Sequence, residues 1–580
     1  MKGGRPGLFR SRCSNMEKKG NILGHKWAAG PLALLFFLLW HSLDLQASVT
    51  ETGNTWLFGW YAGLGALVLA AAVFLGDELF IRRKMTLEAL FAVSVLCLGG
   101  IYSLVLPPLS APDEVSHYIS AYELSNRFLG LPGTDEDGYI YIRAEDDWIE
   151  DVNQEFRDWK EKSEQESLNG ENGETEAGKP IILGQTLKEE TYAAIHDGGA
   201  VSDQSAEQSV AGESAGNSGK TAGLRVSRQP SVRTTPLAYV PQALGFTLAR
   251  VLGLNSIALL YLGRFLNLLL FAAVGVLTIK RLPFGKNVFF GVSILPMSLH
   301  LAASLSYDVV ILAFTGYFTA VCLDLAYKAD TVKVKDVIAL AVVMAVMGPC
   351  KMVYGAIAGF CLLIPVKKFG NWGKWTVSAA AVLGSFLAAM AVVNLRTVAM
   401  YTQESDSYVA WAEEAGYSFA ELLHQPVRVL QLFYNTVAWQ GESLYSGMLG
   451  ESLGNRDAVL NTPYVVILLL TACLVILVLK KPGEEIFMKI KERLWIWFIC
   501  LVIFAALMFS MLLAWTPKSS NMVQGVQGRY MLPLLPVLLL TLKNQKVVRT
   551  GTDDRLVLYT MMAADVYVIL RIFAVVCLRL

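Results

Sequence analysis

The chain contains 580 residues, of which 54% are hydrophobic and 17% are charged. Soluble domains usually carry about 25% charged residues, so this composition excludes a single large soluble enzyme. The high apolar content equally excludes an intrinsically disordered chain. Many apolar runs reach the roughly 20 residues that an α-helix needs to cross a bilayer. We therefore expect an all-α polytopic integral membrane protein.

Acidic and basic residues are equal in number, 49 of each, but their distribution is uneven. Residues 109–236 contain 25 of the acidic residues and only 11 Lys or Arg residues. The sequence has no basic cluster typical of nucleic-acid binding, so we expect no nucleic-acid partner. The eight cysteines are scattered and form no CxxC pair. Their spacing argues against a disulfide framework or a zinc site.

Hydropathy predicts thirteen transmembrane spans. Several are short, notably 351–366 and 529–542, and such segments can be tilted, re-entrant or broken helices beside a cavity. The predicted spans are 27–47, 56–79, 86–107, 257–279, 286–303, 306–326, 335–350, 351–366, 374–395, 462–479, 494–515, 529–542 and 556–578.

Lys and Arg residues concentrate in alternate loops, and this asymmetry predicts the orientation of the spans. It gives a cytoplasmic N-terminus and places residues 108–256, 396–461 and 516–528 outside. The expected location is a cell membrane, which the chain crosses many times. The basic loops lie near residues 82–84, 280–286, 328–335, 367–374, 480–493 and 543–555.

We divide the chain into three parts. Residues 1–84 comprise a cytoplasmic tail and two N-terminal spans, residues 85–545 form the main membrane module, and residues 546–580 contain a last span. The first span could also be a signal peptide, but Leu45-Gln46-Ala47 is a poor cleavage site.

The outer segment 108–256 has three predicted parts. Residues 111–130 have an apolar stripe at helical spacing, and their aromatic residues suit a helix lying on the membrane surface. Residues of about 135–230 are rich in Gly, Ser, Glu and Gln, which predicts a flexible acidic insertion. Residues 236–256 are apolar but interrupted, and we expect a second surface or half-inserted helix there.

Two adjacent carboxylates, Asp113 and Glu114, follow the third span. A carboxylate near an apolar boundary is partly desolvated, which suits it to accept a proton. His117 lies four residues after Asp113, on the same helical face. The alternative is structural, since acidic residues in a first turn cap free N–H groups and stabilise the helix dipole.

Arg529 and Tyr530 stand where the last outer loop enters a span. Arginine is always charged and binds phosphate with two hydrogen bonds, so Arg529 at this depth could hold a lipid phosphate. The alternative is an interface anchor whose guanidinium reaches water beside an aromatic residue.

Further polar residues lie in the outer halves of predicted spans. Ionisable groups within a membrane are functional candidates because their burial is unfavourable. The structural alternative is that Asp308 forms an ion pair with Arg264 or Lys351. The outer loop 396–461 also contains aromatic and amide residues that suit sugar rings or, alternatively, an ordinary membrane interface. The polar candidates are Arg264, Asn267, His300, Asp308, Lys351 and Arg396.

The sequence has no Walker A, GxGxxG, HExxH or GxSxG motif. ATP-driven transport and nucleotide-cofactor redox chemistry therefore have no sequence support. The acidic runs near residues 135–137 and 145–147 lack the spacing of a calcium loop, so a solvated charged surface is the simpler interpretation.

Five segments together resemble a family of bacterial polytopic membrane proteins of unassigned function. That family is itself similar to the GT-C superfamily of integral membrane glycosyltransferases. This chain differs from the usual pattern in its two extra N-terminal spans and its long acidic insertion. The segments are PLSAPDEVSHY at 108–118, PLAYVPQALGFTLARVLGL at 236–254, YLGRFLNLLL at 261–270, LPMSLHLAASLSYD at 295–308 and QGRYMLPLLP at 527–536.

The resemblance implies a GT-C-like architecture and a polyprenyl-phosphate sugar as donor. It implies that Asp113 is a general base on the acceptor hydroxyl and that Glu114 assists it. A divalent metal, Mg or Mn, is needed by only some GT-C enzymes and would bind at Asp113 or Glu114. We expect the substrate-binding residues to be His117, Arg264, Asp308, Lys351, Arg529 and Tyr530.

Three functions remain open at the level of sequence. The first is a glycosyltransferase that modifies an envelope glycan, lipid or protein at the outer face. The second is a transporter or flippase for lipid-linked sugars, although no repeat relates the two halves of the chain. The third is a non-catalytic membrane assembly factor.

Overall fold

The structure is a computed structural model of the 580-residue chain. It describes residues 35, 56–77, 85–135, 138–146, 224–230, 236–402, 408–409, 411–455, 460–485, 488–549 and 553–577.

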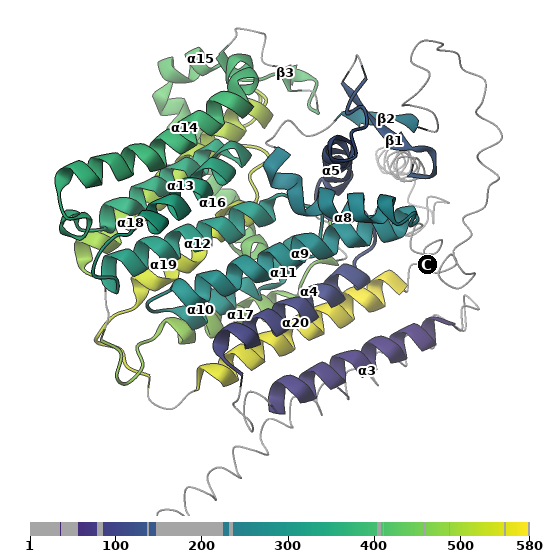
Figure 1. The fold of residues 1–580 in the computed structure, drawn as a ribbon, viewed down its shortest axis with the longest axis horizontal. Helices are drawn as coiled ribbons and strands as arrows, with labels where there is room; N and C mark the ends of the chain where they lie inside the picture. The colour runs from purple at the N-terminus through teal and green to yellow at the C-terminus, as the bar shows by residue number, and fades with distance from the viewer. Residues whose placement is uncertain are drawn as a thin grey trace, which may run out of the picture.

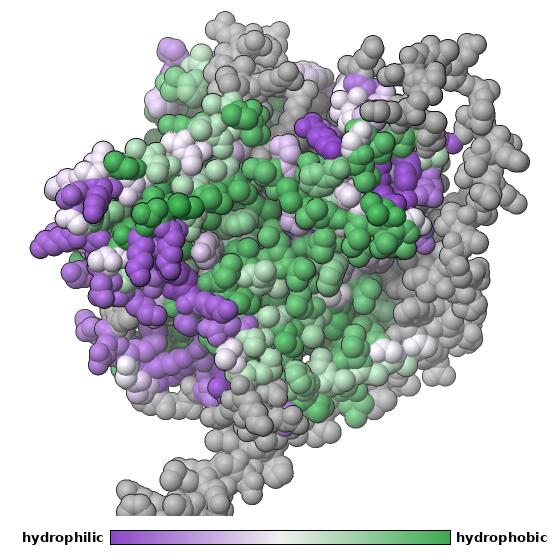
Figure 2. All heavy atoms as spheres, in the orientation of Figure 1, coloured by the Kyte–Doolittle hydropathy of each residue, from purple (hydrophilic) through white to green (hydrophobic). Residues whose placement is uncertain are grey.

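The described part of the chain is an assembly of packed helices with very little sheet (Figure 1). Six of its helices are long and apolar enough to cross a membrane. Figure 2 shows a broad hydrophobic band across the middle of one face, with hydrophilic residues gathered at its edges. The predicted class of all-α membrane protein is confirmed. The six segments are Leu87–Val105, Ser256–Arg281, Asp308–Tyr327, Trp372–Val393, Ile490–Trp515 and Asp554–Phe573.

Several of the thirteen predicted spans are not single long helices. The predicted span 286–303 consists of two short helices, α10 (Lys286–Ser293) and α11 (Pro296–Ala302). The break precedes Pro296, which has no N–H to continue the earlier helix. Segment 351–366 contains the 3₁₀ helix η5 (Met352–Leu363), and 529–542 is divided into η8 (Gly528–Leu534) and α19 (Leu535–Leu542).

Other predicted spans are short or outside the described residues. The apolar stretch of α17 covers only 15 residues and α13 only 17. The predicted first span 27–47 lies almost wholly outside the described residues. Hydropathy counted each apolar run as a span, whereas the structure assigns some runs to short helices that pack against longer neighbours.

Helix α12 lies at the centre of the assembly, and 83% of its apolar window is buried inside the protein. It packs against α9 and α13, while α4 packs between α9 and α20. Polar residues define two of the starts, because Thr86 caps α4 and Asn255 caps α9 through their side-chain oxygens. The long helices are α3 (Trp56–Gly76), α4 (Leu87–Val105), α9 (Ser256–Arg281), α12 (Asp308–Tyr327), α13 (Val334–Cys350), α14 (Trp372–Thr402), α16 (Pro426–Leu449), α17 (Tyr464–Val478), α18 (Ile490–Trp515) and α20 (Asp554–Cys577).

The predicted helix at 111–130 forms as α5 (Glu114–Phe128), but it does not lie on a surface. Tyr118, Ile119 and Tyr122 are fully buried. Helix α8 (Val240–Val251) packs along one side of α5 and strands β1 (Tyr139–Arg143) and β2 (Leu224–Pro230) along another (Figure 1). The predicted apolar stripe is confirmed, but it packs against protein rather than lipid.

The predicted flexible insertion is ordered at both of its edges. Strand β1 pairs antiparallel with β2, which brings residues 139 and 230 together. The acidic stretch 147–223 between the strands lies outside the described residues. The insertion therefore begins and ends at one small sheet, and a Tyr122–Asp146 hydrogen bond of 2.6 Å fastens this region to α5.

The charged loops with many Lys and Arg residues meet at one end of the assembly. Arg281 at the end of α9 forms ion pairs with Asp324 at the end of α12 and Asp336 at the start of α13. Tyr327 donates a hydrogen bond to Glu492 at the start of α18. We call this the lysine-rich end. Asp308 begins α12 and therefore lies at the opposite end, about 30 Å away for a helix of 20 residues.

A minor hairpin and one short helix complete the described elements. Strands β3 (Tyr408–Val409) and β4 (Glu414–Ala415) pair beside α15 (Phe419–His424). Helix α15 begins with a capping box made by Ser418 and Glu421.

Candidate functional site

Asp113 lies at the entrance of α5 in an unusual backbone conformation. Its φ is 56°, in the left-handed region that Asp and Asn enter more readily than most other side chains. It occupies the N-cap position, but its side chain accepts no capping hydrogen bond. The side chain is 68% exposed. Capping by the side chain therefore does not account for Asp113, whose carboxylate is exposed at the entrance of α5.

Arg529 lies beneath this carboxylate. Its Nη2 is 3.5 Å from Asp113 Oδ2, and its Nε is 3.3 Å from Asp308 Oδ2. The Arg529 side chain is only 6% exposed. An interface anchor would extend its guanidinium into water, whereas Arg529 is held inside the protein between two carboxylates.

Lys351 is the second cation of the cluster. Its Nζ donates a 2.7 Å hydrogen bond to Asp308 Oδ1 and lies 4.0 Å above the ring of Tyr530. The Tyr354 hydroxyl donates to the carbonyl oxygen of Tyr530. The junction of α13 and η5 is thereby fixed against η8, so three segments that are distant in sequence meet at Asp308: the start of α12, this junction and η8.

Glu114 and Arg264 form a separate, fully buried ion pair. Arg264 donates from Nε to Oε1 of Glu114 at 2.8 Å and from Nη2 to Oε2 at 2.5 Å. Its remaining donors reach the carbonyl oxygens of Ser103, Leu106 and Pro107. One guanidinium of α9 therefore holds both the end of α4 and the first residue of α5.

The same pair also fixes the loop that precedes α12. The Leu305 N–H donates to Glu114 Oε1 at 3.0 Å. Asn267 donates to the carbonyl oxygens of Ser304 and Ser306, and Gln242 donates to that of Leu305. Since Asp308 follows this loop directly, the Glu114–Arg264 pair determines where Asp113 and Asp308 lie without contacting Arg529.

Gly528 sets the depth of Arg529. A Cβ atom at Gly528 would collide with backbone atoms of Leu444, Gly447 and Met448 on α16. Only glycine permits this approach, so η8 packs directly against the backbone of α16. The next residue, Arg529, is thereby placed inside the assembly rather than at its surface.

His117 packs against the cluster from α5. Its Nδ1 lies 2.8 Å from the Tyr239 hydroxyl, and its ring meets Tyr307 edge to face at 5.3 Å. Burial, together with the positive charge of Arg529, lowers the pKa of His117 from 6.5 to about 4, and Asp113 and Asp308 oppose part of this shift. The imidazole is therefore neutral at pH 7.

Acidification should destabilise the protein through His117. Between pH 6.5 and 4 the unfolded chain binds a proton at this residue that the folded chain excludes, so stability falls as the pH falls. The slope for one proton is at most about 1.4 kcal/mol per pH unit. Thermal unfolding in detergent should show a steeper loss for the wild type than for His117→Gln across this window. Parallel pH profiles would contradict the assignment, because the neighbouring carboxylates titrate in both proteins.

The cluster is balanced in charge, with Asp113 and Asp308 opposite Arg529 and Lys351. A cavity of about 10 Å³ beside Arg529 and Asp308 has room for at most one water molecule. An anionic ligand of larger size must therefore reach Arg529 from the exposed side, where Asp113 lies.

The donor set does not fit a bound divalent metal. Among the described residues, no three His, Cys, Asp or Glu side chains are grouped as a metal site. The Glu114 oxygens are engaged by Arg264 and two backbone N–H groups, and Asp113 faces the Arg529 guanidinium.

The comparison with protein families identifies the chain. A family model described as a predicted membrane protein (DUF2142) matches residues 96–538. The chain belongs to this family. Searches of curated proteins and of solved structures gave no significant match. The matched DUF2142 region extends from α4 to α19 and contains every residue of the cluster.

The site residues expected from sequence fall into two groups in this DUF2142 protein. Asp113, Asp308, Lys351, Arg529 and Tyr530 meet in one cluster, with His117 packed beside it. Glu114 and Arg264 form the separate buried ion pair.

Two tyrosines of the site were missed at the level of sequence, Tyr239 and Tyr354. Tyr239 lies within the quoted PLAYVPQ segment, so a signal for it existed. The sequence contains no signal for Tyr354, because a tyrosine in a short apolar run resembles an ordinary residue of the membrane interface.

Proposed function

We propose that this protein is a membrane glycosyltransferase that moves a sugar from a polyprenyl-phosphate carrier to a hydroxyl group of a cell-envelope acceptor. The main support is the exposed Asp113 carboxylate held against the buried Arg529 guanidinium. A carboxylate can accept the acceptor proton, and a guanidinium can hold the donor phosphate. The two groups that the reaction needs are thus neighbours.

The proposed step balances with these groups. The acceptor oxygen attacks the anomeric carbon of the sugar, and its proton passes to Asp113. The bond between the anomeric carbon and the phosphate oxygen breaks, and the electron pair leaves with the polyprenyl phosphate. Arg529 and Lys351 stabilise the charge on the departing phosphate.

Donor binding and base activation are coupled in this proposal. The 3.5 Å Arg529–Asp113 contact is long for a charge-assisted hydrogen bond, which usually measures about 2.7–2.9 Å. A phosphate oxygen can therefore replace Asp113 on Arg529. The displaced carboxylate then faces the acceptor hydroxyl without a cation that would lower its basicity.

The remaining residues act by positioning. Asp308 keeps Lys351 and Arg529 together, and the ring of Tyr530 lies against both cations. Glu114 was expected to assist the base, but its engagement with Arg264 gives it a structural task in the proposal. It holds Asp113 in place.

A transporter of lipid-linked sugars is the second candidate. Interrupted helices are typical of secondary transporters, and the α10–α11 break at Pro296 and the 3₁₀ segment η5 after Lys351 are interruptions of that kind. Proteoliposomes that contain a fluorescent polyprenyl-phosphate sugar distinguish the two functions. A transferase releases polyprenyl phosphate only when an acceptor is present, whereas a flippase moves the intact donor between leaflets.

Arg529→Ala tests the phosphate site directly. We expect donor affinity to fall about 10- to 100-fold, since hydrogen bonds to a charged group contribute about 1.5–3 kcal/mol. Arg529→Lys should recover part of the affinity because it restores the charge without the two-pronged geometry. The measurement is equilibrium binding of the donor to purified protein in detergent.

Arg127→Ala is the matched control, because Arg127 is an exposed arginine on α5 that pairs with Glu123. It should bind donor like the wild type. Unchanged affinity in Arg529→Ala would remove Arg529 from the phosphate site. Full function of all Asp113 and Arg529 variants would favour a non-catalytic assembly role.

A further inference from the structure

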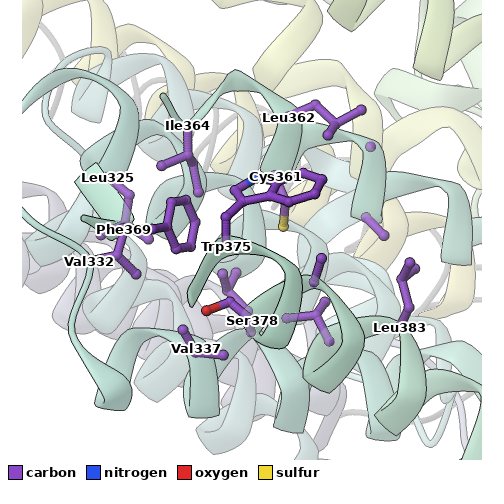
Figure 3. Close-up of a pocket in the computed structure, with 15 residues that line it drawn as sticks. Leu325, Val332, Val337, Cys361, Leu362, Ile364, Phe369, Trp375, Ser378 and Leu383 are labelled. Atoms are coloured by element: carbon purple, nitrogen blue, oxygen red, sulfur yellow. The ribbon is translucent and has the colours of Figure 1, made fainter. Parts of the chain in front are cut away.

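A cavity lies at the lysine-rich end, far from the Asp113 cluster. Its volume is about 290 Å³, and it is bounded by the end of α12, the start of α13, the second half of η5 and the start of α14. Figure 3 shows Leu325, Val337, Phe369 and Trp375 converging on it. An apolar cavity of about half this size, ~150 Å³, can bind a benzene ring.

The cavity opens toward the lipid. Only 11% of the apolar window of α14 is buried inside the protein, so this helix faces the bilayer. Leu362 and Leu383 line the cavity, and both are about half exposed. A chain that enters between η5 and α14 would contact hydrocarbon surface along its whole length.

Lysines surround the cavity at the level of the loops. Lys333, Lys335, Lys367 and Lys374 are exposed, and each lies within three residues of a side chain that lines the cavity. None of these four forms an ion pair with another described residue. A fifth exposed lysine, Lys328, lies in the same loop.

The nearby acidic groups are largely committed elsewhere. Asp324 and Asp336 form ion pairs with Arg281, which leaves Asp330 as the acidic residue in this loop without a described ion pair. Lys368 differs from the surrounding lysines, because its Nζ donates to three carbonyl oxygens at the end of α12. The rim therefore carries excess positive charge.

We infer that this cavity is a binding site for an anionic glycerophospholipid, with one acyl chain inside and the phosphate among the lysines. Basic pockets between helices bind anionic headgroups, with each lysine near the surface contributing about fivefold in affinity. Trp375 lines the cavity and stacks edge to face with Trp372, which suits the headgroup level of a bilayer. The site is independent of the proposed glycosyl transfer.

Filling the cavity tests the acyl-chain site. The purified full chain is delipidated, incubated with vesicles of phosphatidylglycerol or phosphatidylcholine, and analysed by native mass spectrometry. The wild type should retain one phosphatidylglycerol, with at least about tenfold preference over phosphatidylcholine. Ala379→Trp should lose both lipids, and the milder Ser378→Leu should weaken retention. Ala380→Trp is the control, since residue 380 is exposed and lies outside the cavity lining.

Removing the charge tests the headgroup site. The quadruple variant Lys333→Gln, Lys335→Gln, Lys367→Gln and Lys374→Gln should still bind lipid but lose the preference for phosphatidylglycerol. Its control changes four exposed lysines elsewhere at the same end: Lys280, Lys489, Lys491 and Lys546.

Three results would overturn the inference. The first is unchanged lipid retention in both cavity-filling variants, and the second is an unchanged preference in the quadruple variant. The third is displacement of the retained lipid by polyprenyl phosphate at a lower concentration than by phosphatidylglycerol, which would make the occupant a carrier lipid.

Discussion

Asp113→Asn should reduce sugar transfer by about 10²- to 10⁴-fold, which is the usual contribution of a positioned general base. Asparagine has almost the same shape and tolerates the left-handed backbone conformation that Asp113 adopts. The substitution therefore removes the basic oxygen while leaving the local fold in place. Initial rates in proteoliposomes, with donor and acceptor both saturating, measure the effect.

The same variant should bind the donor at least as tightly as the wild type. The Asp113 carboxylate competes with the donor phosphate for Arg529 in the native protein, and the amide of Asn carries no charge to compete. A lower rate of sugar transfer with unchanged or tighter donor binding is expected of a general base, whereas a donor-binding residue would lose affinity as well. Equal losses of rate and donor affinity would contradict the coupled arrangement, and a fully active Asp113→Asn protein would exclude Asp113 as the base.

Glu114→Gln should destabilise the protein by about 3–5 kcal/mol, because it leaves the Arg264 charge buried without its partner. Both side chains are at most 1% exposed, so water cannot take the place of the lost carboxylate. The unfolding free energy in a denaturant titration of detergent-solubilised protein measures the loss. Sugar transfer should fall by more than the folded fraction does, because the pair also positions Asp113.

Glu123→Gln on the same helix is the matched control. Glu123 pairs with Arg127, whose side chain is 58% exposed, and such pairs contribute about 0–1 kcal/mol. The double variant Glu114→Leu, Arg264→Met should be more stable than the single variant Glu114→Leu, because the double variant has no unpaired buried charge. A loss in Glu114→Gln no larger than that in Glu123→Gln would show that Arg264 finds another partner.

The local sequence predicts the membrane class of the protein and helix α5. Long apolar runs can be stable only in lipid or in a core, so composition alone predicts a membrane protein. The stripe of apolar residues in 111–130 predicts α5, because helical periodicity is a local property. Its burial under α8, β1 and β2 could not be predicted, because an apolar face fits protein and lipid equally well.

The candidate site shows the same division. Asp113, Asp308, Lys351 and Arg529 all lie at the borders of apolar runs, and so the sequence indicates a shared membrane depth for them. The sequence does not indicate which of these residues form ion pairs with one another. Asp308 was assigned to Arg264 or Lys351, and the structure pairs it with Lys351 and Arg529 while Arg264 pairs with Glu114, 150 residues away.

A helical membrane protein, with several polar residues at one end of its helices, follows from the amino-acid sequence. The packing of the helices is needed to tell that the Asp113 carboxylate is exposed beside the buried Arg529, whereas the Glu114 carboxylate is enclosed with Arg264. Hydropathy records the preference of each residue for lipid or water, and it is fixed by the residue alone. An ion pair depends on the directions of two side chains after their helices have packed, and that information is not local.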